Sequence, residues 1–169
     1  MTAKARNFAF AAVIALASLV ARPAAAQESG IEVGTVAPDA AVETLDGKAA
    51  SLRSLVGEKP VLIEFWATWC GVCKELEPAI EAAQAKYGSR VNFVGVAVSA
   101  NQSAERVRRY TALHLKGFTH FYDRRGNAVE AYDVPATSYI VILGRDGKVA
   151  YSGLGAKQAI DAALAKVLE

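Results

Sequence analysis

One stretch of this chain constrains its fold more than any other, because a buried strand, a cysteine pair and a helix follow one another without a break. The run from Val61 to Trp66 is apolar except for Glu64, which is typical of a strand buried on both faces. Apolar residues then recur at helical spacing until Gly88, a residue type that commonly ends helices. The members of that pattern are Val72, Leu76, Ala79, Ile80, Ala83 and Tyr87. Cys70 and Cys73 therefore lie where a central strand passes into a helix.

Strand and helix patterns alternate along the rest of the chain. Two Asp-Gly pairs, beginning at Asp46 and Asp146, supply the positive φ angles of tight turns and predict one hairpin near each end. Ser103 is a good N-cap for a second helix. The predicted strands are 41–45, 49–52, 61–66, 91–98, 118–122, 139–143 and 149–152, and the last helix buries Ile160, Leu164, Val167 and Leu168. Because helical crossovers imply parallel pairing and hairpins add antiparallel strands, we predict an α/β fold with a mixed sheet flanked by helices.

The first 26 residues have the layout of a secretory signal peptide. Basic residues precede an apolar run from Phe8 to Val20, and three alanines, Ala24 to Ala26, precede Gln27. A helix that spans a bilayer needs about 20 apolar residues, and this run is shorter. We therefore expect cleavage near Ala26 and a periplasmic or otherwise exported protein. The alternative is an uncleaved signal that anchors the protein to the inner membrane.

Charge and length indicate a single domain after the signal. Removing residues 1–26 takes away three basic and no acidic residues, so 16 basic and 17 acidic residues remain and the net charge is −1. The remaining 143 residues fit a lead-in segment at 27–38 and one domain at 39–169 with a sizeable core. Three arginines within 106–109 form the densest basic group, and on a predicted helix they are typical of a solvated face. We therefore expect no nucleic-acid partner.

Both cysteines of the chain belong to one sequence, Cys70-Gly71-Val72-Cys73. A disulfide persists in an exported protein, but closing a ring of four residues removes little entropy from the unfolded chain. A structural zinc site needs four ligands, and the other candidates, His114 and His120, lie far along the chain. The haem attachment pattern is absent because Lys74 follows the second cysteine. We therefore expect the pair to have a chemical role.

The segment Phe65-Trp66-Ala67-Thr68-Trp69-Cys70-Gly71-Val72-Cys73-Lys74 resembles the active-site segment of thioredoxins, and Pro78 matches the proline inside their active-site helix. Segments 34–39 and 44–48 resemble the start of the TlpA-type, peroxiredoxin-like subgroup of redoxins. Together these matches cover nearly the whole mature chain. The resemblance implies a thioredoxin-like three-layer fold with an amino-terminal hairpin extension. It also implies a thiol:disulfide oxidoreductase that needs no cofactor beyond a redox-active Cys70–Cys73 disulfide.

The chemistry of disulfide exchange explains why two cysteines are needed at this place. The thiolate is the attacking form, and an ordinary thiol with a pKa of about 8.5 is mostly protonated at neutral pH. Cys70, at the start of the predicted helix, faces unpaired backbone N–H groups and the positive end of the helix dipole. Cys70 is therefore the predicted nucleophile. Cys73, one helical turn along, is predicted to resolve the mixed disulfide by attacking Cys70.

Glu64 is the second residue with a predicted catalytic role. A charged and unpaired carboxylate inside an apolar strand is costly in free energy. Its position matches the buried aspartate of thioredoxins, and that resemblance implies a base that takes the Cys73 proton, with burial raising its pKa. The alternative is a partly exposed glutamate at the strand end. Trp69 is expected to pack beside the site and shield it, whereas Trp66 is expected in the core.

Two departures from the thioredoxin pattern concern the predicted substrate-binding residues. Val72 follows Gly71 where proline is more common, so the redox potential is not inherited from that pattern. Thioredoxin-like proteins place a cis-proline opposite the active site, and an alignment without gaps puts Ser138, preceded by Thr137, in its place. The alternative is a shifted loop in which Pro135 serves. Since a cis bond before a non-proline residue costs about 2.5 to 4 kcal/mol, we expect a trans peptide or local strain at Ser138.

Three functions are compatible with these residues. The resemblance favours disulfide exchange on exported proteins, with reduction preferred over oxidation, and a second protein that donates or accepts electrons. The first alternative is a periplasmic metallochaperone that holds Cu(I) through the thiolates of Cys70 and Cys73. The second alternative is a thiol peroxidase, which needs one peroxidatic cysteine in a different local setting. The direction of electron flow stays open at this stage.

Overall fold

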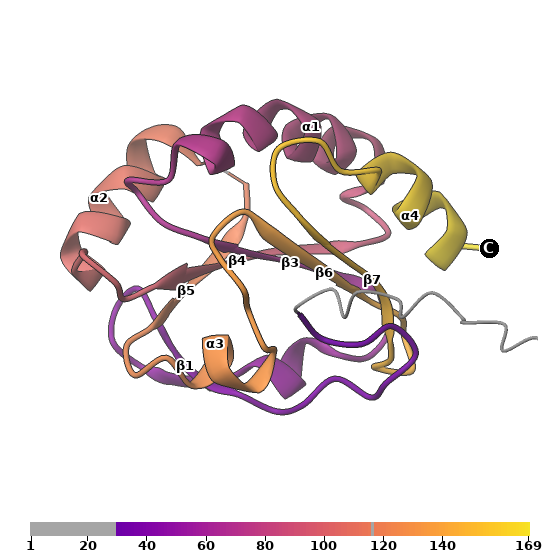
Figure 1. Ribbon diagram of the computed structural model, residues 1–169, viewed down its shortest axis with the longest axis horizontal. Coiled ribbons are helices and arrows are strands. Elements are labelled where there is room, and N and C mark those ends of the chain that lie inside the picture. Colours follow the sequence, from indigo (N-terminus) through magenta and orange to yellow (C-terminus); the bar gives the residue numbers. More distant parts are fainter. Residues whose placement is uncertain (1–29, 116) are drawn as a thin grey trace, which may run out of the picture.

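The computed structural model of the protein describes residues 30–115 and 117–169, and the predicted signal peptide lies outside them (Figure 1). Its centre is a seven-stranded sheet in the order β2-β1-β5-β4-β3-β6-β7. The strands are β1 (Ala41–Thr44), β2 (Ala49–Ser51), β3 (Val61–Trp66), β4 (Asn92–Val98), β5 (Thr119–Asp123), β6 (Tyr139–Leu143) and β7 (Val149–Leu154). The helices are α1 (Gly71–Tyr87), α2 (Ala104–His114), α3 (Asn127–Ala131), α4 (Ile160–Val167) and the 3-10 helix η1 (Leu52–Leu55).

β3 is an interior strand of the sheet, and all six of its residues are buried. It pairs in parallel with β4, which pairs in parallel with β5, because α1 and α2 carry the chain back across the sheet. On its other side β3 pairs antiparallel with β6, which forms the carboxy-terminal hairpin with β7. The amino-terminal hairpin of β1 and β2 joins the opposite edge through antiparallel pairing of β1 with β5. The predicted α/β fold, with a mixed sheet, an amino-terminal hairpin and flanking helices, is confirmed.

Helices cover both faces of the sheet, so the protein has three layers (Figure 1). α1, α2 and α4 lie on one face, and α3 and η1 lie on the other. Alternate side chains of β3 supply both cores: Phe65 packs on the α3 side, and Leu62 packs against α1 and α4. Trp66 belongs to a third cluster that also contains Cys70 and Cys73. The cysteine pair therefore adjoins the core at the end of β3.

α1 is the longest of the described helices, with 17 residues. It ends before Gly88, as predicted, and Pro78 lies inside it. Its buried stripe consists of Cys73, Leu76, Ile80, Ala83 and Tyr87. In the described part of the chain, no helix combines the length and the apolar character that crossing a bilayer requires.

The residue pattern does not predict α3 or η1. α3 has five residues, too few for a periodic pattern to be recognised. It is stabilised by Asp123 at the end of β5, whose Oδ2 accepts the N–H groups of Ala128 at 3.0 Å and Val129 at 2.9 Å. Amides in the first turn of a helix have no partner within the helix. This carboxylate therefore caps the amino end of α3.

The described part of the lead-in, residues 30–38, is bonded to the rest of the domain. The N–H of Gly34 donates to the carbonyl of Val149 at 2.7 Å. The N–H of Ile31 donates to the hydroxyl of Tyr139 at 2.9 Å. Hydrogen bonds therefore tie this segment to β6 and β7.

Candidate active site

Cys70 and Cys73 form a disulfide at the amino end of α1. Their Cα atoms lie 5.3 Å apart, within the range that a disulfide spans without backbone movement. Cys70 is the N-cap residue of the helix, and its sulfur accepts the N–H of Cys73 at 3.0 Å. The expected Cys70–Cys73 disulfide is thus present at the expected junction of strand and helix.

The start of α1 favours negative charge on the Cys70 sulfur. The first N–H groups of a helix have no partner within it, and the helix dipole is positive at this end. The first turn of α1 contains no acidic residue that would oppose this effect. A Cys70 thiolate in the same place would keep the Cys73 N–H as a hydrogen-bond donor, so the geometry favours the thiolate over the thiol.

The disulfide is almost covered by its surroundings. Cys70 keeps 4% of its surface exposed and Cys73 keeps 7%. The residues beside them protrude, since Trp69 is 45% exposed and Val72 is 44% exposed. Gly71 is exposed as well. An incoming sulfur must therefore pass an apolar rim to reach the Cys70 sulfur.

Glu64 and the two cysteines line one small cavity. Its volume is about 30 Å³, enough for a water molecule. Glu64 itself is 6% exposed, so the alternative of a partly exposed strand-end glutamate is wrong. Burial, with a smaller effect of the Glu77 carboxylate, raises the pKa of Glu64 to about 8. Glu64 is therefore an acid whose ionisation falls near neutral pH, in a cavity that Cys73 also lines.

Further titratable side chains reach this cavity from α1 and α2. Glu77 and Glu81 follow Cys73 at intervals of four and eight residues, which places them on the same face of α1. Burial and the Glu81 carboxylate raise the pKa of Glu77, against opposing effects of neighbouring cationic groups. Lys74 and Tyr110 complete the polar part of the lining. Sequence reasoning missed these residues, although the helical spacing from Cys73 is a signal that identifies the two glutamates.

Gly95 on β4 and His120 on β5 lie in line with Glu64 across neighbouring strands of the sheet. Glu64 is in register with Gly95, and Gly95 is in register with His120. These positions share one face of the sheet, and a side chain at Gly95 would collide with His120 and Trp66. Burial lowers the pKa of His120 to about 4, against a smaller effect of the Leu115 backbone. His120 is therefore a neutral residue of the core at physiological pH.

The two histidines considered as metal ligands do not line the cavity of the cysteines. His114 packs against the ring of Tyr110 on α2, with ring centroids 4.6 Å apart. Within residues 30–115 and 117–169, no group of three or more His, Cys, Asp or Glu side chains is arranged to hold a metal ion.

Ser138 lies directly before β6 and beside the end of β3. Its N–H donates to the carbonyl of Phe65 at 2.8 Å, and its carbonyl accepts the side-chain amide of Gln158 at 3.1 Å. The described residues contain no cis peptide bond, and Ser138 has a φ of 67°. Such a left-handed conformation costs about 1 to 3 kcal/mol in a residue other than glycine, so the expected strain at Ser138 is present. Pro135 is exposed, three residues earlier.

A groove of about 360 Å³ borders the loop that carries the cysteines. Its lining is mostly apolar and consists of Trp69, Val98, Ser99, Ala100, Gly126, Val129, Val134, Ala136 and Thr137. Trp69 is held at the edge of the groove because its Nε1–H donates to the carbonyl of Ala100 at 2.8 Å. The groove thus brings together two predicted substrate-binding residues, Trp69 and Thr137, and does not include Val72 or Ser138.

Known sequences resemble this chain over most of its length. A family profile described as Redoxin matches residues 32–168. The thioredoxin-like protein YneN of Bacillus subtilis is 35% identical over 124 residues, which cover 73% of this chain and 72% of YneN. The thiol-disulfide oxidoreductase ResA of the same organism is 31% identical over 124 residues, which cover 73% of this chain and 68% of ResA.

Solved structures agree with the fold. The thiol:disulfide interchange protein of the thioredoxin family from Chlorobium tepidum has a TM-score of 0.67 at 24% identity, over 80% of this chain and 97% of that chain. A secreted disulfide oxidoreductase from Mycobacterium tuberculosis, homologous to Escherichia coli DsbE, has a TM-score of 0.61 at 25% identity, over 76% of this chain and 93% of that chain. The predicted thioredoxin-like fold is therefore confirmed.

Proposed function

Because this chain belongs to the Redoxin family and is a thiol:disulfide oxidoreductase with a Cys70–Cys73 pair, we propose that it reduces disulfides in other exported proteins. The observation that carries the proposal is the position of Cys70 as the N-cap of α1, where its sulfur accepts the Cys73 N–H. A sulfur in that place is stabilised as the anion that attacks disulfides.

The proposed reaction transfers two electrons from the enzyme dithiol to the substrate. The Cys70 thiolate attacks one sulfur of a substrate disulfide, which forms a mixed disulfide and releases the other sulfur as a thiolate that takes up a proton. Cys73 then loses its proton and attacks Cys70, which forms the Cys70–Cys73 disulfide and releases the second substrate thiolate. The substrate leaves as a dithiol, and a separate dithiol protein must reduce Cys70–Cys73 again.

Acidic residues around the cavity support reduction rather than oxidation. Glu77 and Glu81 line it from α1 together with the cationic Lys74, and Glu64 adds a further negative charge when it is ionised, so the lining is negative overall. Negative charge near a thiolate disfavours the anion. A reduced form that is less stable makes the dithiol a stronger reductant, so these acids lower the reduction potential of the pair.

Glu64 is the proposed proton acceptor for Cys73. The cavity that both residues line has room for one bridging water molecule. With a pKa of about 8, the ionised form of Glu64 is basic enough to take a proton from a thiol. Glu64 would return this proton to solvent along the polar lining of the cavity.

The substrate is proposed to dock as an extended segment across the rim of the site. Trp69 and Val72 offer protruding apolar contacts on the two sides of the disulfide. Gly71 leaves the start of α1 open, because nothing lies within 4 Å of the position of a Cβ there. The loop from Pro135 to Thr137, with Thr137 in the groove, is the proposed surface for the substrate backbone, whereas Ser138 is fully buried behind it.

The proposed setting of the reaction is the exported compartment. The pattern of residues 1–26 is that of a secretory signal peptide, and cleavage near Ala26 would release the protein. Retention of that segment would instead anchor it to the inner membrane. The partners in either setting are protein disulfide substrates and a protein electron donor.

The test is to follow insulin reduction and to trap the substrate. Replacing Cys70 by serine is expected to abolish turnover, because no nucleophile remains. Replacing Cys73 by serine is expected to leave the first attack intact and to accumulate a mixed disulfide, since the resolving sulfur is missing. Non-reducing electrophoresis and mass spectrometry of the Cys73→Ser protein from the exported fraction identify the trapped partner.

A Cys73→Ser protein that turns over at the full rate would refute the resolving role of Cys73. A wild-type protein that binds one equivalent of Cu(I) tightly and shows no exchange activity would support the metallochaperone instead.

A further inference from the structure

The segment after β4, residues 99–102, holds the loop that delivers Cys70 to the start of α1. The Thr68 backbone N–H donates to the side-chain Oε1 of Gln102 at 2.9 Å, and the indole N–H of Trp69 donates to the carbonyl of Ala100 at 2.8 Å. Within the loop, the Cys70 N–H donates to the carbonyl of Ala67 at 3.0 Å. The turn that ends in Cys70 is thus fastened by two hydrogen bonds to one neighbouring segment.

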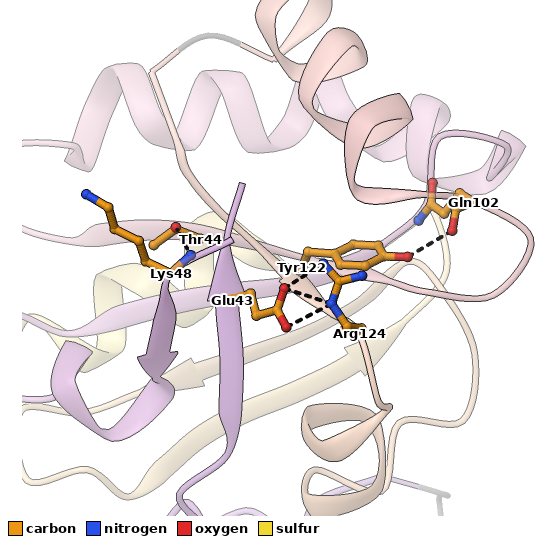
Figure 2. Close-up of polar contacts among 6 residues, drawn as sticks. All are labelled: Glu43, Thr44, Lys48, Gln102, Tyr122 and Arg124. Atoms are coloured by element: carbon orange, nitrogen blue, oxygen red, sulfur yellow. Dashed lines mark hydrogen bonds and ion pairs between the residues drawn. The ribbon is translucent and has the colours of Figure 1, made fainter. Parts of the chain in front are cut away.

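Gln102 is itself held at three points. Its side-chain Nε2 donates to the carbonyl of Val98, and its backbone N–H donates to the carbonyl of Ser99 at 3.4 Å. Its backbone carbonyl accepts the hydroxyl of Tyr122 at 2.9 Å, and Figure 2 shows this hydroxyl directed at Gln102 from β5. Because both the backbone and the side chain are fixed, Oε1 is a preorganised acceptor for the Thr68 amide.

The chemistry of the position suits a neutral amide. Gln102 offers an acceptor to the Thr68 N–H and a donor to the Val98 carbonyl, and the two partners together determine the orientation of the amide. A carboxylate would lack the donor, and its negative charge would disfavour the nearby Cys70 thiolate. An amide positions the loop without changing the charge of the site.

We propose that Gln102 is a positioning residue of the redox pair, which acts through the Thr68 amide to keep Cys70 at the N-cap of α1. This inference rests on the proposed function and concerns the same site. A Cys70 that shifts away from the N-cap loses the Cys73 N–H as a donor. The thiolate is then less stabilised, so attack at neutral pH is slower and the reduction potential of the pair is more negative.

The test compares two substitutions that disturb Gln102 in different ways. Gln102→Met keeps the length of the side chain but loses its contacts with Thr68 and Val98, whereas Tyr122→Phe loses only the hydroxyl that donates to the Gln102 backbone carbonyl. The first readout is the equilibrium constant of the Cys70–Cys73 disulfide with glutathione. The second readout is the ultraviolet absorbance of the Cys70 thiolate in the reduced protein as the pH is raised.

In Gln102→Met, the equilibrium is expected to move about 3- to 10-fold toward the disulfide, as for the loss of one hydrogen bond. A tenfold change corresponds to about 30 mV. The thiolate titration is expected to move to higher pH in the same variant. Tyr122→Phe is expected to shift both values less than Gln102→Met does, because it frees the Gln102 backbone carbonyl but keeps the side-chain contact with Thr68.

Wild-type values in Gln102→Met, or equal shifts in Tyr122→Phe, would overturn the proposal. Gln102→Ala is measured beside them, because it removes the amide without placing a thioether in the same space. If neither Gln102 variant folds, the residue serves the stability of the whole domain and the positioning role is rejected. Failure of the wild-type protein to reduce insulin would count against the proposed function alone, because the equilibrium and the titration need no turnover.

Discussion

Glu64 illustrates how burial adjusts the chemistry of a single residue. A carboxylate with an ordinary pKa near 4.5 is a weak base toward a thiol whose pKa is about 8.5. Burial in β3 and the nearby Glu77 carboxylate raise the pKa of Glu64 to about 8, which brings acid and thiol close to each other in strength. Proton transfer between Cys73 and Glu64 is then nearly balanced in both directions.

Replacing Glu64 by glutamine is expected to slow the second step of the reaction and to spare the first. The amide keeps the size of the side chain but takes no proton, so resolution of the mixed disulfide is expected to fall about 100-fold or more. In the wild-type protein the rate of this step rises with pH through about 8, as Glu64 ionises. In Glu64→Gln the rate follows the ionisation of the Cys73 thiol alone, so the rise is expected at higher pH. Single-turnover measurements of substrate release between pH 6 and pH 9 check both expectations, because this range includes the Glu64 pKa of about 8.

Glu77→Gln is the matched control, because Glu77 lines the same cavity. Glu77 raises the pKa of Glu64, so its removal moves the rise in rate to lower pH without abolishing it. A Glu64→Gln protein that keeps the wild-type pH dependence would show that another group takes the proton.

The residues of the site differ in how visible they are in the sequence. Glu64 stands out because an acid interrupts an apolar run. Gln102 lies in a polar loop and acts on the backbone of Thr68, 34 residues away along the chain. Almost every residue type has a backbone N–H, so a contact with that group does not depend on the identity of its partner. The sequence pattern therefore does not predict this contact.

At the scale of the elements, α3 depends on a single carboxylate. Oδ2 of Asp123 accepts two N–H groups at the start of this short helix, and the Asp123 side chain is fully buried. Five residues form too few internal hydrogen bonds to stabilise a helix on their own. The longer helices α1 and α2 are recognisable from their apolar spacing, whereas α3 exists because of tertiary contacts.

Replacing Asp123 by alanine is expected to lower the free energy of unfolding by about 2 to 3 kcal/mol. Two N–H groups, of Ala128 and Val129, would lose the carboxylate that now accepts them, and buried donors without partners are costly. Urea unfolding, followed by circular dichroism, measures the change.

Glu105→Ala on the exposed surface of α2 is the control for this loss. It removes an ion pair with Arg109, and exposed pairs of this kind contribute about 0.5 kcal/mol or less. Equal losses in the two variants would show that the carboxylate of Asp123 has no special part in holding α3.

At the scale of the whole molecule, the amino-terminal hairpin extends one edge of the sheet by two strands. β1 pairs with β5, and the Glu43 carboxylate on β1 accepts the Arg124 guanidinium at 2.8 Å (Figure 2). The residue pattern predicts both hairpins and the parallel strands between them. It does not predict which strand receives the amino-terminal hairpin, because that pairing depends on contacts between segments about 80 residues apart, such as those of Glu43 and Arg124.

Two buried groups give the free energy of unfolding opposite dependences on pH. The pKa of Glu64 is raised from an ordinary 4.5 to about 8, so the folded protein holds a proton there that the unfolded chain releases, and stability falls as the pH rises from 4.5 to 8. The pKa of His120 is lowered from 6.5 to about 4, so the unfolded chain binds a proton there first. The stability that neutral, buried His120 contributes is therefore fully present above pH 6.5, and it is lost as the pH falls from 6.5 to 4.

These two dependences oppose each other between pH 4.5 and pH 6.5, where they nearly cancel. Between pH 6.5 and pH 8 only Glu64 still titrates, so the free energy of unfolding of the oxidised protein is expected to fall by about 2 kcal/mol over this interval. Glu64→Gln removes this fall, and because His120 then acts alone, the variant is expected to lose stability below pH 6.5 instead. Urea unfolding of both oxidised proteins at pH 5, 6.5 and 8 measures the free energy of unfolding in each interval. The first two pH values cover the range in which both groups titrate, and the last two cover the range in which only Glu64 titrates. A wild-type profile that is level above pH 6.5, or the same fall in Glu64→Gln, would mean that Glu64 is ionised in the folded protein at neutral pH and that burial beside Cys73 does not hold its proton.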